Sequence, residues 1–339
     1  MGHAIINHAI TLGFSACFLL VAVTSILAAP LSTNAPPLPA QGRAKSVSSS
    51  PLADRLHRHV VQLAEKIGER NVSRPKALQA AADYIRGEWL QQGYEVTSQR
   101  YVARGVTSEN IEVSRPGSVQ PDEIIVVGAH YDTAPGTPGA DDNASGVAAL
   151  LEISRVLEKP DLGRTVRLVA FVNEEPPFFF WGPMGSGVYA EAARRRGDDI
   201  VAMLSLEMLG VYSDRPYSQR YPPFLGFFYP DRGNFIAFVS NLSSRPVLKR
   251  VVKAFRSVSS FPSEYLVAPS LVPGVGWSDQ LSFWRVGYPA LMVTDTAFYR
   301  YAHYHKPEDT PDKLDYDRMA QVVDGLAKTI AALADDEDL

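Results

Sequence analysis

Short apolar runs that alternate with helical spacing are the feature that most constrains the fold of this chain. After Glu123 the runs expected to form strands are 124–127, 166–172, 201–206, 235–239 and 290–293. Apolar residues at helical spacing fill the intervals at 146–157, 186–196, 247–255 and 316–333. This alternation predicts an α/β fold with a mostly parallel central sheet and helices on both faces. Such sheets bind ligands at the carboxyl ends of their strands.

The folded body is expected to span residues 52–333 as one domain. Before Glu123 the pattern predicts two helices and two strands, at 55–70, 75–92, 94–102 and 110–113. The final residues, 334–339, include four acids and are expected to form a solvated tail.

The N-terminal segment carries an apolar run from Ala9 to Ala29 that contains no charged residue. The run is long enough to span a bilayer, and a Pro/Ser-rich linker follows it at 30–51. No Lys or Arg precedes the run and no clean cleavage site ends it, so residues 1–29 are predicted to be either a signal peptide or a signal anchor. A buried core helix fits less well, because a linker follows. We therefore predict an exported protein, periplasmic or extracellular, that contacts a membrane only through this segment.

The composition of the 339 residues excludes several classes of function. Lys and Arg number 33 against 37 acids, and no basic patch stands out in the body, which argues against a nucleic-acid partner. The only cysteine, Cys17, lies in the apolar run, so the body has neither a disulfide framework nor a thiolate zinc site. Any metal ion must be held by His, Asp and Glu.

The first candidate site residues follow the run 124–127. His130 is expected at a strand end, and Asp132 is placed to reach its second ring nitrogen, as the carboxylate partners of zinc-bound histidines do. Farther on, Asp141 and Asp142 stand in a segment rich in Asn and Ser that leads into a helix. These residue types are preferred helix caps, but a cap needs only one carboxylate. Capping and metal binding both remain open here.

Acids also end the next two predicted strands. Glu174 and Glu175 follow 166–172, and adjacent carboxylates at the end of a buried strand are costly unless a partner neutralises them. A divalent cation is the simplest partner, with one carboxylate as ligand and the other as general base. The alternative is a solvated loop, which the apolar segment 176–181 disfavours. Glu207 directly follows the predicted strand 201–206, and His305 follows the predicted strand 290–293.

Together these positions provide two imidazoles, three carboxylates and no sulfur, at His130, Asp142, Glu175, Glu207 and His305. Such a set suits two zinc ions about 3.5–4 Å apart that share one carboxylate and a water.

The same motifs resemble the co-catalytic di-zinc aminopeptidases of metallopeptidase family twenty-eight. The matching pieces are Gly-Ala-His-Tyr-Asp, Ala-Asp-Asp-Asn-Ala-Ser-Gly, Asn-Glu-Glu, Glu-Met-Leu-Gly and His-Tyr-His-Lys-Pro-Glu-Asp-Thr, in family order between about Leu56 and Leu326. The resemblance implies that Asp142 bridges two zinc ions. His130 and Glu207 would complete one zinc site, and Glu175 and His305 the other.

The resemblance also implies roles beyond the ligands. Glu174 would be the general base, Asp132 would support His130, and Tyr304 would stabilise the oxyanion. Asp279 would lie around the ligands, in a segment where the family usually reads Ser-Asp-His and this chain has Gln280. If the missing imidazole orients the substrate or a ligand, turnover is reduced.

The implied function is hydrolysis of the peptide bond next to a free amino terminus, with two Zn²⁺ per chain. Peptides would be the partners, and the aromatic-rich segments 176–181 and 221–230 suggest a pocket for a bulky apolar first residue, although these aromatics equally suit a core or surface role. Three alternatives remain open: a glutaminyl cyclase with one zinc, a carboxypeptidase, and a non-catalytic binding ectodomain of the same fold.

Overall fold

The computed structural model of this chain describes residues 50–158 and 161–336. The predicted signal segment 1–29, nearly all of the linker and the last three residues of the tail lie outside this range. Among the described helices, none is both long and apolar enough to cross a membrane.

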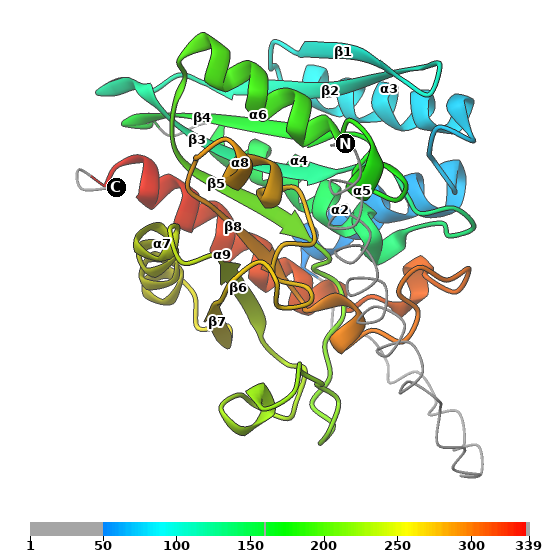
Figure 1. Cartoon of the computed structure of the whole chain (residues 1–339), viewed down its shortest axis with the longest axis vertical. Coiled ribbons are helices and arrows are strands. Elements are labelled where there is room, and N and C mark those ends of the chain that lie inside the picture. The colour runs from blue at the N-terminus through cyan, green and yellow to red at the C-terminus, as the bar shows by residue number, and fades with distance from the viewer. Residues whose placement is uncertain (1–49, 159–160, 337–339) are drawn as a thin grey trace, which may run out of the picture. The chain divides into compact units, whose positions relative to one another are not determined.

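One sheet of eight strands forms the centre of the described body (Figure 1). Its strands, in spatial order, are β1 (Thr97–Ala103), β2 (Val106–Arg115), β4 (Arg164–Phe171), β3 (Gln120–His130), β5 (Asp199–Glu207), β8 (Ala290–Thr294), β6 (Ile236–Ser240) and β7 (Ser263–Val267). The pairs within β4–β3–β5–β8 and the pair β6–β7 are parallel, and the other three pairs are antiparallel. The predicted mostly parallel central sheet is confirmed.

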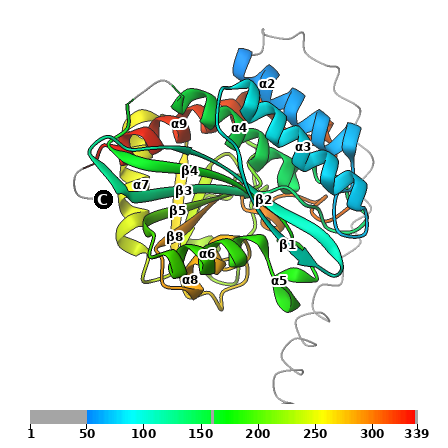
Figure 2. The ribbon, with the colours of Figure 1, turned by 90° about the horizontal axis from the view of Figure 1, so that it is seen from above.

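Helices cover both faces of this sheet, as the view from above shows (Figure 2). The helices α2, α3, α4, α7 and α9 lie on one side, and α6 and α8 lie on the other. The helices are α2 (Pro51–Val60), α3 (Pro75–Gln91), α4 (Gly146–Leu157), α5 (Phe178–Trp181), α6 (Gly185–Arg196), α7 (Arg245–Val258), α8 (Gln280–Arg285) and α9 (Tyr316–Ala334), with π turns η1 (Val61–Ile67) and η2 (Ala140–Ser145) and 3₁₀ turns η3 (Leu225–Phe227), η4 (Ala297–Tyr299) and η5 (Pro311–Lys313).

The alternation of side chains along β3 explains the two-sided core. Ile125 and Val127 pack into the larger apolar cluster, which includes α4 and α9, whereas Ile124 and Val126 pack into the cluster with α6. A strand buried on both faces reads as a continuous apolar run, which is why 124–127 was recognisable in the sequence.

Three local differences from the predicted elements have physical causes. The first helix begins at Pro51, where the Ser50 hydroxyl accepts the Ala53 N–H at 3.1 Å, and it continues as η1 until Gly68 at φ 80°. The strand β7 is not among the predicted strands, because it is a partly exposed edge strand that begins with Ser and Glu and has a short apolar part at 265–267. The helix α8 was missed because six residues are too few to show helical spacing.

The acidic tail contacts the body at its first two acids. The Asp335 carboxylate accepts the Gly163 N–H at 2.8 Å, and Asp336 lies 3.6 Å from Arg250. Asp335 is nevertheless exposed and Asp336 is partly exposed, so these two residues remain solvated while they contact the body.

Candidate active site

Strand ends that lie next to one another carry most of the predicted ligands. His130 is the last residue of β3 and Glu207 is the last residue of β5, and Glu174 and Glu175 follow shortly after β4. Because β4, β3 and β5 are parallel neighbours, their carboxyl ends meet at one edge of the sheet. The spatial proximity expected from the sequence is therefore present.

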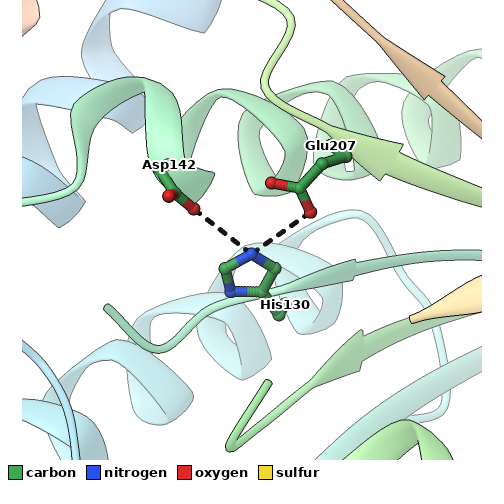
Figure 3. A group of neighbouring side chains, drawn as sticks. All are labelled: His130, Asp142 and Glu207. Carbon is green, nitrogen blue, oxygen red and sulfur yellow. Dashed lines mark ion pairs between the residues drawn. The ribbon is translucent and has the colours of Figure 1, made fainter. Parts of the chain in front are cut away.

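His130, Asp142 and Glu207 form the first group of possible metal ligands. His130 Nε2 lies 3.4 Å from Asp142 Oδ1 and 3.3 Å from Glu207 Oε2. Figure 3 shows the imidazole pointing between the two carboxylates, one from the turn that precedes α4 and the other from β5. All three side chains are buried, and one ligand atom of each lies within 4.8 Å of the other two.

Asp142, Glu175 and His305 form a second group that shares Asp142 with the first. His305 comes from the segment between β8 and α9, and its Nε2 lies 3.1 Å from Asp142 Oδ2 and 3.2 Å from Glu175 Oε2. The two oxygens of Asp142 therefore face two different imidazoles, Oδ1 toward His130 and Oδ2 toward His305. A carboxylate in this position has one oxygen available for each of two cations.

The donor set of this cluster fits zinc. His305 Nε2 is buried and forms no hydrogen bond of normal geometry, although two carboxylate oxygens lie within 3.2 Å of it. Glu175 Oε1 is also buried without a partner. Buried carboxylates are costly unless they are paired or bind a metal ion, and imidazole and carboxylate are ligands that Zn²⁺ accepts. Each group offers three such ligands.

Asp132 holds the loop that carries the two glutamates. Its Oδ1 and Oδ2 accept the backbone N–H groups of Glu174 and Glu175, each at 3.1 Å. The sequence predicts that this carboxylate supports His130, which it also approaches. In the structure Nδ1 of His130 donates to the backbone carbonyl of Asp132 at 3.2 Å, whereas Oδ1 lies farther away at 3.6 Å. Asp132 therefore orients the imidazole through its backbone, which leaves Nε2 free to bind a cation.

Asp309 forms a second clamp of the same kind, which the sequence does not single out. Its two carboxylate oxygens accept the N–H groups of Asp141 at 2.9 Å and Asp142 at 3.2 Å, and the Tyr301 hydroxyl donates to it at 3.0 Å. Because Asp309 follows His305 closely, the clamp joins the segments of two ligands. The only sequence signal is its place in the motif 303–310, where an acid is equally suited to solvent.

Polar residues next to Asp142 bind the end of β5. Asn143 Nδ2 donates to the Leu206 carbonyl at 2.8 Å, and its Oδ1 accepts the Met208 N–H at 3.1 Å. The same Oδ1 accepts the N–H of the first residue of α4, so Asn143 caps that helix as well. The segment that the sequence left open between capping and metal binding therefore caps α4, and it also carries Asp142, a possible metal ligand, and fixes Glu207 relative to it.

A buried arginine, Arg70, supports the loop between β3 and η2. Its side chain is inaccessible to solvent and donates to the carbonyl oxygens of Tyr131 at 2.7 Å, Pro138 at 2.6 Å and Gly139 at 2.9 Å. Burial lowers the pKa of Arg70 to about 10 against the opposing effect of the site's acids, so the side chain stays charged at neutral pH. No sequence pattern identifies this residue, because it reads as the end of a predicted helix.

Glu174 lies beside the ligands without belonging to either group. Its Oε2 is 4.0 Å from His130 Nε2. Burial raises the pKa of Glu174 well above its ordinary value, with His130 opposing the rise and Glu175 adding to it. A carboxyl group that must take and return a proton works best with such a raised pKa.

Tyr304 stacks on His305, with ring centroids 3.8 Å apart. Burial and the carboxylates of both ligand groups raise the pKa of Tyr304 well above its ordinary value, so the phenol stays protonated. Its hydroxyl is therefore available as a hydrogen-bond donor at the site.

The ligands themselves have strongly shifted pKa values. Burial acts to lower the pKa of His305, but Asp142 and Glu175 raise it to about 10. Burial, with Asp142 adding to it, raises the pKa of Glu175 to about 7. Burial acts in the same direction on Asp142, but hydrogen bonds and charge from His130 and His305 hold its pKa below the ordinary value. A cation that binds here displaces protons, so its affinity rises with pH.

A cleft opens beside the metal-binding cluster, with Glu207 and Tyr304 at the shared end. The cleft has a volume of about 820 Å³, including the part that is open to solvent. Strands β6, β7 and β8 supply its floor, and the walls come from segments 219–229, 273–277 and 296–299. Most of the lining side chains are apolar or aromatic.

Of the two aromatic-rich segments, 221–230 contributes described side chains to this cleft. Tyr221, Leu225 and Tyr229 line it. Phe178, from the segment 176–181, is instead buried in a separate apolar cluster, and no described side chain of that segment lines the cleft.

Asp279 and Gln280 lie at the start of α8, and both are completely buried. Neither Asp279 oxygen has a hydrogen bond of normal geometry, and burial, opposed by His130, raises the pKa of this side chain to about 7. Gln280 Nε2 donates to the carbonyl of Val275 at 3.0 Å, behind a residue that lines the cleft. The effect of Gln280 on turnover remains a prediction.

The fold and the site together define a metal-dependent hydrolase. The sequence model of peptidase family M28 matches residues 110–330, so the chain belongs to that family and is a zinc-dependent peptidase. It is 40% identical to the uncharacterized protein YfbL of Escherichia coli (strain K12) over 282 residues, which cover 80% of this chain and 86% of YfbL. The family resemblance inferred from the motifs is confirmed.

Solved structures show the same fold. BSAP, a zinc aminopeptidase from Bacillus subtilis, superposes with a TM-score of 0.66 and 16% identity over 85% of this chain and 96% of its own. A glutaminyl cyclase from Bacteroides thetaiotaomicron superposes with a TM-score of 0.61 and 20% identity over 82% of this chain and 97% of its own. Because both enzymes share the fold, the activity has to be argued from the site.

Proposed function

We propose that this protein is a di-zinc aminopeptidase that removes amino-terminal residues from peptides. The observation that carries the proposal is Asp142, whose two oxygens face the imidazoles of two separate ligand groups. A site for a single cation would not need a carboxylate shared in this way. Membership in peptidase family M28 supports the peptide bond as the target.

His130, Asp142 and Glu207 would hold one zinc ion, and Asp142, Glu175 and His305 would hold the other. Bound zinc lowers the pKa of a water and polarises a carbonyl group. Backbone and carboxylate clamps keep the ligands in place, so little reorganisation is needed when the ions bind.

Glu174 would take the proton of the attacking water and return it to the leaving amine. Its raised pKa suits both steps, and it is free to move protons because neither ligand group includes it. The Tyr304 phenol would donate a hydrogen bond to the carbonyl oxygen as negative charge develops there.

The cleft would take the side chain of the first residue, because it begins at Glu207 and is lined mainly by apolar groups. We therefore expect a preference for peptides that start with a bulky apolar residue. Export through the N-terminal segment would place this activity outside the cytoplasm.

The test is zinc content followed by a substrate panel, on purified protein beginning near Leu52. Two zinc ions per chain and faster cleavage of leucyl than of acidic or basic peptides are expected, with no cleavage of the same peptides after acetylation of the amino group. One zinc ion together with cyclisation of amino-terminal glutamine would replace the proposal by a glutaminyl cyclase. Cleavage from the carboxyl end would indicate a carboxypeptidase, and no zinc after growth with ample zinc would indicate a binding domain.

A further inference from the structure

Four residues form one row across the floor of the cleft. Strand pairing aligns Glu207 with Thr294, Thr294 with Ala237, and Ala237 with Glu264. Residues that pair directly across strands present their side chains on the same face of a sheet, and all four of these residues line the cleft. The row begins at a metal ligand on β5 and ends at Glu264 on the edge strand β7.

Glu264 is a half-buried carboxylate with no bonded partner among the described residues. Burial raises its pKa, and Arg256 opposes this from a distance. The Arg256 guanidinium is itself bonded to Ser263, through Nε to the hydroxyl at 3.0 Å and through Nη2 to the carbonyl. Most side chains that line the cleft with Glu264 are apolar or aromatic, including Tyr229 and Leu266, and Arg220 is the one basic residue among the described lining residues.

The strand register sets the length of side chain that reaches Glu264. Three steps between strands place its Cα about 14 Å from that of Glu207, at about 4.8 Å a step. At about 1.25 Å per bond from Cα to the last heavy atom, a glutamate side chain spans about 5 Å of this distance, an extended lysine or arginine about 6–7 Å and a leucine about 4 Å. Of a substrate held at the metal end, only a long side chain reaches the carboxylate.

We propose that Glu264 is a specificity-determining residue, which makes the cleft accept amino-terminal lysine and arginine in addition to bulky apolar residues. The inference rests on the proposed aminopeptidase function. The apolar walls cover the methylene stem of the basic side chain, as they do in snorkelling lysines. The carboxylate accepts a charge-assisted hydrogen bond from its end.

The test compares peptides that start with lysine, arginine, norleucine and leucine, since norleucine has a comparable apolar stem without the ammonium group. In Glu264→Gln we expect the ratio of kcat/KM for lysine to that for norleucine to fall about tenfold, mainly through KM, because one charge-assisted bond is lost. Activity on leucine stays within about twofold. Glu264→Lys should reduce this ratio of kcat/KM further, because a positive charge at this position repels the lysine ammonium group.

The matched control is Glu191→Gln, the same charge change at an exposed site on α6, where the side chain is 65% accessible. In this control, the ratio of kcat/KM for the lysine peptide to that for the norleucine peptide should equal the wild-type ratio. An unchanged ratio in Glu264→Gln, an equal fall in the control, or a wild type that rejects lysine while it cleaves leucine would each overturn this inference alone. A wild type with two zinc ions and no activity on any of the four peptides would overturn the proposed function and this inference with it.

Discussion

The metal-binding cluster and the apolar cleft share an edge, but they are held together in different ways. In the cluster, Asp132 and Asp309 each accept two backbone N–H groups from segments that carry ligands. In the cleft, the walls meet through rings such as those of Trp277 and Phe298, whose centroids lie 5.4 Å apart, and through hydrogen bonds such as that from Gln219 to Thr296 at 2.8 Å. Hydrogen bonds to buried carboxylates hold the first region, whereas the second combines aromatic packing with hydrogen bonds between its walls.

The difference follows from what each region has to hold. Charged ligands in a buried volume must be placed accurately, because a misplaced one leaves uncompensated charge. Apolar walls need mainly shape and volume, and these tolerate exchange of similar side chains. We therefore expect single polar substitutions to abolish the chemistry and single apolar substitutions to change substrate choice.

The largest expected effect separates chemistry from metal binding within the cluster. Glu174→Gln should lower kcat by about 10²- to 10⁴-fold, because the general base is removed, and should leave zinc content unchanged. The measurements are kcat on a leucyl peptide and zinc per chain. Glu175→Gln is the matched control and should lose zinc as well. Full activity in Glu174→Gln would show that another group is the base.

The second effect tests the Asp309 clamp. Asp309→Ala should weaken zinc binding about 10- to 100-fold, since the segment of Asp142 loses two acceptors for its N–H groups. Competition with a chromophoric chelator measures this, and added zinc should restore part of the activity. Asp312→Ala, at a surface acid nearby, should bind zinc like the wild type. Equal affinities in both variants would mean that the clamp does not position the ligand.

The third effect concerns the pH dependence of stability. Asp279 has its pKa raised to about 7 by burial, against about 3.9 in an unfolded chain. Its contribution to stability is complete below pH 3.9 and is lost as the pH rises through 7, because the folded state then holds the proton that the unfolded state has released. In the absence of metal, the free energy of unfolding of Asp279→Asn should therefore rise by about 2–4 kcal/mol relative to that of the wild type as the pH increases from 4 to 8.

Urea unfolding in the presence of a chelator, at pH 4 and at pH 8, measures this difference. Asp324→Asn changes an exposed acid on α9 and should follow the wild type at both values. If the difference in unfolding free energy between Asp279→Asn and the wild type is the same at pH 4 and pH 8, the pKa of Asp279 is not raised.

The smallest effect is expected in the cleft. Tyr229→Ala should raise KM for leucyl peptides about three- to tenfold, through lost apolar contact, while zinc content stays the same. Phe227→Ala is the control, because that side chain is 83% exposed and does not line the cleft. A fall in zinc content with Tyr229→Ala would mean that the two regions are not independent.

The sequence predicted the positions that carry the chemistry because each has a local signal. His130, Glu175 and Glu207 follow apolar strands that are parallel neighbours, and the motifs around Asp142 and His305 match the family. Glu264 comes before the short apolar part of β7 and not after it, so the sequence gives no reason to place it at a site. The aromatic residues at 176–181 indicate apolar contacts, but the sequence does not show which apolar cluster Phe178 joins.

By itself, the sequence determined the alternation of most strands and helices, the types of the candidate ligands and the family, because each is written in residue type and local spacing. Only the tertiary structure decided that the oxygens of Asp142 face opposite imidazoles and that the carboxylate of Asp132 binds the N–H groups of Glu174 and Glu175 in addition to lying near His130. Such arrangements depend on hydrogen bonds between residues far apart in the chain, as between Asp309 and Asp141, which are 168 positions apart. Periodicity along one segment carries no information on its register against another, so only the folded chain establishes these contacts.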